Sequence, residues 1–178
     1  MLTFTHAEVG EVLGVGTTAV NSLLSRARES VRASAGRPQP GIDDPRVQRL
    51  LERYVRAWHL ADIDGFVQLV AEDVQFSMPP LTTWFIGRDA AATFVENAIF
   101  APTRPHGIRL VAGSCNGQPA FAAYEPAGHG PRMVTGLQVL QLGDVEGQPV
   151  IVALVSYRDP ALAIRCGLPA ALPATPMA

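Results

Sequence analysis

The sequence contains no lysine, so all 14 of its basic residues are arginines. Acidic residues offset them, and the formal net charge at pH 7 is −2. This balance excludes a protein that binds nucleic acid through general basic charge. No uninterrupted run of about 18 apolar residues occurs, which argues against a membrane-spanning helix. A basic start followed by an apolar stretch is also absent, so we expect a cytoplasmic protein rather than a secreted one.

Cysteine is scarce as well, with two in 178 residues. Cys115 and Cys166 are isolated and form no Cys-x-x-Cys pair, so we expect two free, reduced thiols. The four histidines are widely separated: His6, His59, His106 and His129. This spacing contains no metal-ligand pattern, and we predict neither a metal nor a cofactor. Apolar residues make up 48% of the chain, which suffices for the core of one ordinary domain with a short appendage.

The segment from Gly16 to Arg32 predicts one amphipathic helix with two different faces. Apolar residues at helical spacing form a stripe: Val20, Leu23, Leu24, Ala27 and Val31. The opposite face carries short polar side chains and then arginines: Thr17, Thr18, Asn21, Ser22, Ser25, Arg26, Arg28 and Arg32. Short polar groups at a helix start can reach base edges, and arginines nearby bind phosphates. We therefore predict that this polar face contacts DNA in the major groove.

The residues before this helix predict a first, shorter helix. Thr5 and Glu8 have the spacing of a capping box, and Gly14-Val15-Gly16 allows a tight turn after it. A helix, a short glycine-containing turn and a second helix together indicate a helix-turn-helix. An αα-hairpin that packs on the rest of the chain fits the same pattern, and the pattern alone does not decide between them.

Residues 2–31 resemble the end of region 4 in bacterial extracytoplasmic-function (ECF) sigma factors. A first phrase of that family occurs as Glu8, Val9, Leu13 and Gly14. The helix phrase that follows occurs as Val20, Asn21, Ser22, Leu24, Arg26, Ala27 and Arg28. Gly16 departs from the family, in which Ser or Thr usually caps the helix, but glycine is an acceptable cap. The resemblance implies promoter DNA and RNA polymerase core as partners, and transcription initiation as the process.

The first 33 residues are too few to fold alone, because ordering them costs more than burying one apolar stripe returns. Other helices must cover the stripe. In the family that this segment resembles, two further helices of region 4 and all of region 2 come earlier. We therefore expect a truncated chain, or a start codon assigned too late.

A second unit follows a Pro- and Gly-rich linker over residues 34–44. Apolar periodicity predicts three helices, at residues 45–59, 62–70 and 88–98, with a short strand at 74–78. Two hairpins follow: residues 108–114 and 120–125 around Asn116-Gly117, and residues 133–142 and 150–157 around 144–147. Helices followed by an antiparallel meander predict an α+β domain over residues 45–160. The Ala- and Pro-rich tail, 161–178, is expected to fray.

Residues 53–80 resemble the opening of the SnoaL-like superfamily, and the likeness extends over about residues 45–160. The resemblance implies a cone of the nuclear transport factor 2 type, in which three helices close a curved antiparallel sheet around a pocket. In the ketosteroid isomerases of this superfamily a tyrosine helps form the oxyanion hole, and Tyr54 matches it. The general base of those enzymes falls on Met78, whose thioether cannot abstract a proton. We therefore predict no catalysis, and expect Tyr54 to be a core residue with a satisfied hydroxyl.

Large side chains of this second unit are the candidates to line its pocket: Tyr54, Trp58, Phe66, Phe76, Met78, Trp84, Phe94 and Phe121. A hollow pocket would bind a small hydrophobic ligand, whereas a filled one would make the cone a rigid docking piece. The leading hypothesis is promoter recognition regulated in cis by the cone. The alternative is a small-molecule enzyme or binding protein, which a carboxylate inside the pocket would favour. An inert product is the third hypothesis.

Overall fold

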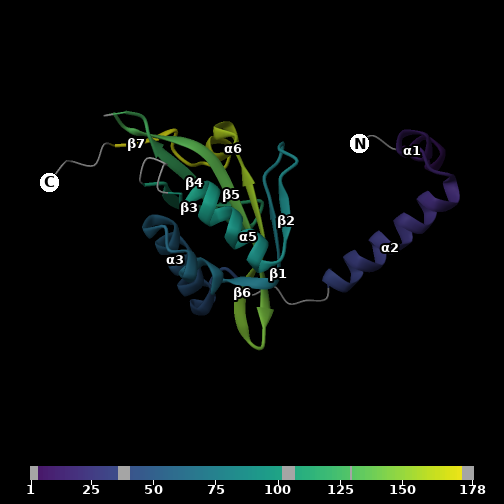
Figure 1. Ribbon diagram of the computed structural model, residues 1–178, viewed down its shortest axis with the longest axis horizontal. Helices are drawn as coiled ribbons and strands as arrows, with labels where there is room; N and C mark the ends of the chain where they lie inside the picture. The colour runs from purple at the N-terminus through teal and green to yellow at the C-terminus, as the bar shows by residue number, and fades with distance from the viewer. Residues whose placement is uncertain (1–3, 36–40, 102–106, 129, 174–178) are drawn as a thin grey trace. The chain divides into compact units, whose positions relative to one another are not determined.

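The computed structural model describes residues 4–35, 41–101, 107–128 and 130–173, with backbone only over residues 30–35. The chain divides into two compact units, Met1–Pro38 and Gln39–Ala178. We call the first the helix pair and the second the cone, and describe each by itself (Figure 1). No helix within the described ranges is both long and apolar enough to cross a bilayer.

The helix pair consists of α1 (His6–Leu13) and α2 (Thr17–Ala35). Both halves of the predicted capping box are present, since Thr5 and Glu8 bond each other's backbone N–H groups. Gly14 ends α1 in the left-handed conformation, with φ of 66°, which glycine adopts at little cost. The Gly16 carbonyl then accepts the N–H of Val20 and starts α2. The second helix continues to Ala35, so the first residues of the predicted linker are helical.

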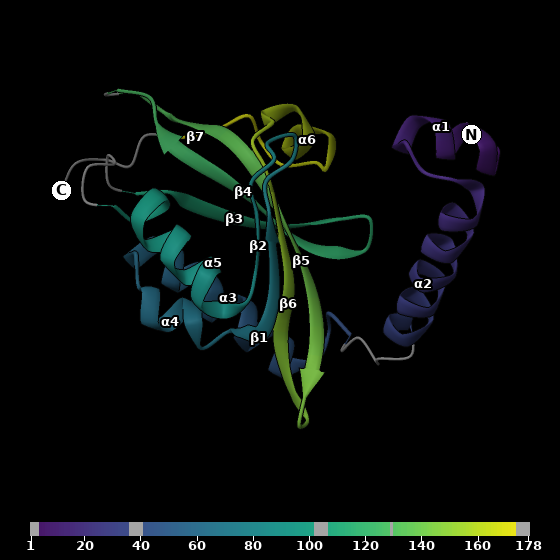
Figure 2. The ribbon, with the colours of Figure 1, turned by 45° about the vertical axis from the view of Figure 1, so that its right-hand side comes forward.

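The cone begins with α3 (Pro45–Leu60), where Asp44 caps the helix and Pro45 takes its first position as predicted. Next come α4 (Ile63–Val67) and a longer helical segment, α5 (Arg88–Phe94), which runs on into a π-helical turn, η1 (Val95–Ile99). Helix α4 is shorter than the helix predicted at residues 62–70, because the Leu69 carbonyl accepts the N–H of Ile151 and Val70 enters the sheet. These helices cover one face of the sheet (Figure 2).

Within the described residues the sheet contains seven strands: β1 (Val70–Ser77), β2 (Trp84–Ile86), β3 (Arg109–Cys115), β4 (Gln118–Pro126), β5 (Arg132–Val145), β6 (Gln148–Tyr157) and β7 (Ala171–Leu172). The order is β2-β1-β6-β5-β4-β3, and β7 pairs with β5. All pairs are antiparallel except β1–β6, which is parallel. The predicted α+β class is therefore confirmed, although the sheet is not a simple meander.

Both predicted hairpin turns are present. Asn116 and Gly117 have φ of 51° and 75°, and Glu146 and Gly147 have 52° and 78°. Two successive residues at positive φ match the right-handed twist of the flanking strands, which explains the Asn-Gly sequence of the first turn. In the second turn the Asp144 carboxylate also accepts the N–H of Gly147.

The described part of the predicted tail, residues 161–173, does not fray as we expected, because it packs on the sheet; residues 174–178 lie outside the described residues. Helix α6 (Pro160–Arg165) places Ala163 in a second, smaller core against β4 and β5. Leu168 is buried in the same core and lies over Gly113, where a Cβ would meet its side chain at 3.1 Å. The tail is largely apolar, but glycine and prolines interrupt it, so no regular apolar spacing signals this packing.

The prediction of two free thiols is wrong, because Cys115 and Cys166 form a disulfide. Cys115 ends β3 and Cys166 follows α6, and the packing of α6 on the sheet brings their Cα atoms to 5.5 Å. The two residues lie 51 positions apart in the sequence, so only the tertiary fold makes them neighbours.

Candidate functional site

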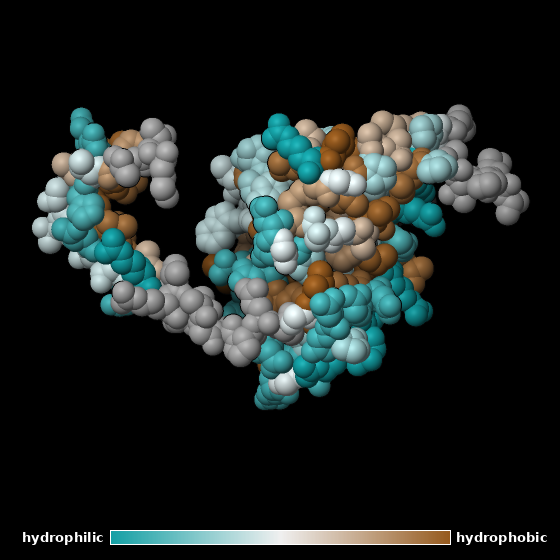
Figure 3. All heavy atoms as spheres, turned by 180° about the vertical axis from the view of Figure 1, so that it is seen from behind, coloured by the Kyte–Doolittle hydropathy of each residue, from teal (hydrophilic) through white to brown (hydrophobic). Residues whose placement is uncertain are grey.

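The predicted DNA-binding face of α2 is open to solvent. The side chains of Thr17, Thr18, Asn21, Ser22, Ser25, Arg26 and Arg28 are all exposed. Arg32 belongs to α2, but its side chain lies outside the described residues. Hydrophilic and hydrophobic residues are both visible on the surface of this helix pair (Figure 3). The unit therefore presents polar and basic groups along a helix that starts directly after a tight turn.

The apolar stripe of α2 is only partly covered within its own unit. Val20 is buried and lies near Gly10 of α1, where an added Cβ would approach the Val15 carbonyl oxygen to 2.7 Å but Val20 Cγ2 only to 3.7 Å. Leu24 is half-buried and Leu23 is exposed. Val31 falls outside the described side chains. Two helices alone therefore bury the start of the stripe and leave its next turn open.

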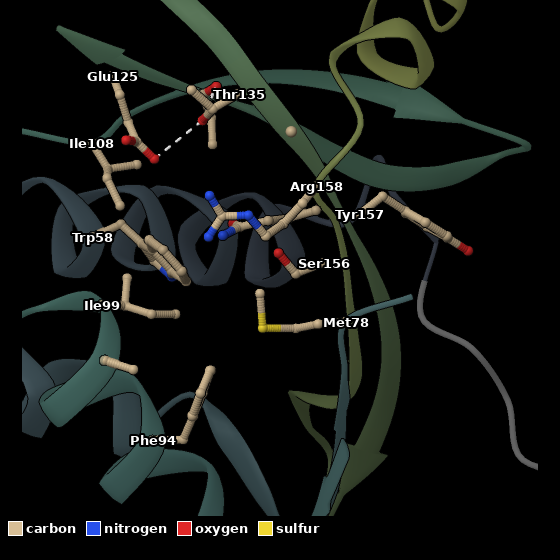
Figure 4. A pocket seen from close by; sticks show the side chains of 14 residues that line it. Trp58, Met78, Phe94, Ile99, Ile108, Glu125, Thr135, Ser156, Tyr157 and Arg158 are labelled. Atoms are coloured by element: carbon tan, nitrogen blue, oxygen red, sulfur yellow. Dashed lines mark hydrogen bonds between the residues drawn. The ribbon is translucent and has the colours of Figure 1, made fainter. Parts of the chain in front are cut away.

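A cavity of about 80 Å³ lies in the cone between the helices and the sheet (Figure 4). Apolar side chains form one part of its wall: Trp58, Met78, Phe94, Ala98, Ile99, Ile108 and Ala123. Residues of β4, β5 and β6, with Arg158 directly after β6, form the rest: Glu125, Thr135, Gly136, Gln138, Ser156, Tyr157 and Arg158. The cavity is thus amphipathic, with an apolar part and a mostly polar part in its wall.

Three of the predicted lining residues, Trp58, Met78 and Phe94, contact this cavity. The others lie elsewhere. Tyr54, Phe66, Phe76 and Phe121 are each 1% exposed or less and belong to the main core. Tyr54 stacks at 5.3 Å from Phe121 and 6.4 Å from Phe66, measured between ring centroids. These aromatic rings belong to the packed main core rather than to the wall of the cavity.

Trp84 differs from the prediction, since 64% of it is exposed. It lies on the edge strand β2, where successive side chains point to opposite faces of the sheet. Its neighbour Phe85 points inward and stacks on Phe94 at 4.9 Å between centroids. In β2 the middle residue, Phe85, is therefore partly buried, and the residues on either side, Trp84 and Ile86, are exposed.

Tyr54 is the core tyrosine that we expected, with a satisfied hydroxyl. Its hydroxyl donates to Oε1 of the buried Gln138 at 2.8 Å. Burial raises the pKa of Tyr54 well above its usual value, and the nearby indole N–H of Trp58 opposes this shift more weakly. Trp58 Nε1 is buried, and no contact within hydrogen-bonding distance and angle joins it to Tyr54 or to any other described residue.

The polar side of the cavity was not predicted from the sequence. Thr135 donates to the Ala123 carbonyl at 3.2 Å and lies 3.3 Å from Oε1 of Glu125. The Arg158 side chain extends toward Trp58, as Figure 4 shows. Finding Glu125 required the strand register, because the β4–β5 pairing shifts between Ala123 and Tyr124. No sequence motif marks such a shift.

A second hollow of about 220 Å³ adjoins the cavity and shares Trp58, Ile99, Ile108 and Glu125 with it. His59 also lines it, and its Nε2 accepts the N–H of Leu110 at 3.0 Å. Partial burial lowers the pKa of His59, and the positive charge of Arg109 adds to the effect. His59 thus joins α3 to β3 as a neutral imidazole. His106 lies outside the described residues.

The described part of the chain holds no group of three or more His, Cys, Asp or Glu side chains that could bind a metal ion. Met78 lies in the cavity wall at the position expected for an isomerase base. A thioether has no proton-accepting ability at neutral pH, so the wall lacks the base in that place.

Residues 51–152 match the family described as SnoaL-like domain. Two curated proteins also match, each named ECF RNA polymerase sigma factor SigG, from the CDC 1551 / Oshkosh and H37Rv strains of Mycobacterium tuberculosis. Each is 37% identical over 175 residues, which is 97% of this chain and 46% of theirs. The chain therefore spans about half the length of the curated relatives it matches. Those relatives bear the names of sigma factors, not of enzymes.

Among solved structures, an NTF2-like protein of unknown function from Pseudomonas putida KT2440 is similar, with a TM-score of 0.54. It is 13% identical, and the alignment covers 67% of this chain and 89% of that protein. At that identity the likeness concerns the fold alone, and it confirms the predicted cone. The family match covers more than half of the sequence, and the matched residues include most of the helices and strands of the cone. The chain belongs to the SnoaL-like domain family.

Proposed function

We propose that the chain recognises promoter DNA in transcription initiation, in the manner of region 4 of a sigma factor. The observation that carries the proposal is the open polar face of α2, which follows a capped first helix and a glycine turn. The 37% identity to SigG over 97% of the chain supports it. RNA polymerase core is then the protein partner, and the cytoplasm is where the chain acts.

In this proposal the polar face divides into two roles. Thr17, Thr18, Asn21, Ser22 and Ser25 contact base edges. Arg26, Arg28 and Arg32 contact phosphates and set the position of the helix. Because the net charge is −2, few phosphates are neutralised and isolated binding is weak. The logarithm of the affinity should fall with a slope of about −0.9 per phosphate contact against the logarithm of salt concentration.

The cone acts in this proposal as a regulatory or ligand-sensing module on the same chain. Its amphipathic cavity supports a binding role, because a purely structural cone would have an apolar filling. The proposal predicts that occupying the cavity changes the affinity of the whole chain for DNA. An affinity that stays constant while the cavity is saturated would remove the regulatory part.

The test of base reading starts from selection of preferred sites out of a random duplex library by the whole chain at low salt. Asn21→Ala should relax the preference for the selected site by about 5- to 100-fold, since one good base contact provides about 1–3 kcal/mol of discrimination. Arg28→Ala should weaken all sequences alike. Arg49→Ala serves as the control, because Arg49 is equally exposed but lies on α3 of the cone. Equal effects of Asn21→Ala and Arg28→Ala on every sequence would refute the assignment.

A small-molecule binding protein of the SnoaL-like family is the second candidate, and Glu125 favours it by placing a carboxylate in the cavity. Catalysis is a weaker proposal. Met78 occupies the expected base position, and the Tyr54 hydroxyl donates to Gln138 rather than into the cavity. Turnover of a steroid or polyketide model substrate, lost in Glu125→Gln, would overturn this judgement.

A further inference from the structure

The indole N–H of Trp58 is a hydrogen-bond donor for which the described residues supply no acceptor. Trp58 is 4% exposed and lines the cavity, and its Nε1 has no hydrogen-bond partner within the described part of the chain. Buried Trp N–H groups are usually paired, because an unsatisfied buried donor is costly. Trp58 is held in place by Tyr54 and Phe100, with ring centroids at 5.9 and 5.5 Å. A donor fixed in this way indicates that something with an acceptor atom occupies the space beside it.

An acceptor lines the same space. The Glu125 carboxylate lines both the cavity and the adjoining hollow, as Trp58 does. Among the described residues, the hydrogen-bond partner of Glu125 is the Thr135 hydroxyl, which lies 3.3 Å from its Oε1 and is shared with the Ala123 carbonyl. A carboxylate offers about four acceptor positions, so most of its capacity remains for a donor. A group that both accepts a hydrogen bond and donates one, as a hydroxyl does, satisfies both side chains.

The charges of the lining favour a neutral occupant. Glu125 and Arg158 both contact the cavity and have opposite signs. An anion would meet Glu125, and a cation would meet Arg158, in a space from which water is partly removed. The rest of the wall, including Met78, Phe94 and Ile99, is apolar and would cover a hydrocarbon body.

The size of the cavity limits the occupant further. The cavity and the adjoining hollow measure about 80 and 220 Å³, which together reach only the lower end of the roughly 300–1,000 Å³ of sites for drug-sized ligands. We propose that the cavity, together with the adjoining hollow, binds a small neutral alcohol. Its hydroxyl accepts from Trp58 Nε1–H and donates to Glu125, and its hydrocarbon body packs on the apolar wall. This inference rests on the ligand-sensing part of the proposed function and names the class of ligand.

Four probes of similar shape test this assignment on the whole chain: cyclohexanol, cyclohexanone, methylcyclohexane and cyclohexanecarboxylate. Cyclohexanol donates and accepts hydrogen bonds, and cyclohexanone only accepts them. Methylcyclohexane does neither, and cyclohexanecarboxylate is an anion. The chain has two tryptophans, so Trp84→Phe leaves Trp58 as the sole indole reporter. Trp84 is exposed on the edge strand β2, away from the cavity lining. Binding is followed by Trp58 fluorescence and by isothermal titration calorimetry.

Cyclohexanol should bind about 10-fold more tightly than methylcyclohexane, since each hydrogen bond adds roughly a 2- to 10-fold gain. Cyclohexanone should fall between them. Glu125→Met should weaken cyclohexanol to the level of cyclohexanone and leave cyclohexanone unchanged. In Trp58→Phe, followed by calorimetry, cyclohexanone should lose its advantage over methylcyclohexane, and cyclohexanol should keep only the part that its hydrogen bond to Glu125 provides. Trp84→Phe is the matched control for that variant and should change none of the affinities.

Equal affinity for cyclohexanol and methylcyclohexane would overturn the proposal, as would tighter binding of the carboxylate or no binding of any probe. The probe series on the unchanged Trp58 and Glu125 decides this even if Trp58→Phe does not fold. Promoter selection is measured without any probe. Failure of alcohol binding therefore leaves promoter recognition standing, and failure of promoter recognition leaves the binding result intact.

Discussion

The cone and the helix pair differ in how completely each covers its own apolar side chains. The cone has a main core formed by buried residues from α3 to β6, and a second, smaller core that includes Ala163 of α6. In the helix pair, Val20 is the buried large hydrophobic side chain among the described residues, whereas Val12, Leu13 and Leu23 are 77%, 57% and 45% exposed. The cone therefore buries enough of its own apolar surface to be stable alone, whereas the helix pair depends on a partner surface to cover its apolar stripe.

The largest effect should appear when the two units are separated. A chain of residues 39–178 should retain a cooperative thermal transition close to that of the whole chain. A peptide of residues 1–38 should show little helix in water, because isolated helices of this length are marginal. Far-ultraviolet circular dichroism measures both. A strongly helical peptide, or a cone that melts without cooperativity, would break the comparison.

The next largest effect should come from the disulfide, which adds a covalent link to the packing of α6 on the sheet. Cys115→Ser should lower the free energy of unfolding by about 2–4 kcal/mol, since the bond closes a loop of 51 positions. Urea denaturation with and without reductant gives this value. Reductant should destabilise the unchanged chain by the same amount and leave Cys115→Ser unaffected. An unchanged midpoint in both cases would show that packing alone holds α6.

A smaller effect is expected at the buried hydrogen bond between helix and sheet. Tyr54→Phe leaves the Gln138 Oε1 without its donor and should cost about 1–3 kcal/mol. Tyr157→Phe is the control, since its ring points away from the other cavity residues in Figure 4. The two variants are compared by urea denaturation. A cost for Tyr157→Phe equal to that of Tyr54→Phe would argue against a specific role of the hydrogen bond.

The smallest effect should come from His59 and should depend on pH. Its Nε2 accepts from Leu110 only when the imidazole is neutral, and its pKa in the folded chain lies below the ordinary 6.5. The stabilisation is therefore complete above pH 6.5 and is lost as the pH falls through the lower, folded pKa. We expect a loss below about 1 kcal/mol, because His59 is partly solvated.

His59→Gln supplies the control for this pH dependence. A glutamine oxygen can accept the same N–H but does not titrate, so the loss on acidification should shrink. His6→Gln, at an exposed position on α1, should leave the dependence as it is in the unchanged chain. If His59→Gln unfolds with the same pH dependence as the unchanged chain, other groups are responsible.

Local signals predicted most of the fold. The Asn116-Gly117 turn, the Asp44 cap and the helix face containing Val47 and Tyr54 follow from backbone preference and apolar spacing, which short segments determine. The disulfide and the packing of α6 depend on contacts between distant segments. No local pattern indicates such contacts.

The candidate site was predictable to the same extent. The exposed face of α2 follows from helical spacing alone. The cavity was placed only approximately, because the edge strand that carries Trp84 was not predicted and Glu125 was missed. A strand of three residues is too short to show a period, and the position of Glu125 depends on strand register, which shifts every side chain to the opposite face when it moves by one residue.

The parallel pairing of β1 with β6 has a consequence for synthesis on the ribosome. Val70 pairs with Ile151, so β1 can pair with β2 early but waits for β6, its other neighbour, until most of the chain has been translated. Helix α2 leaves the exit tunnel long before β6 does. Each nascent molecule therefore passes through a stage in which α2 has been released and the sheet of the cone is unfinished.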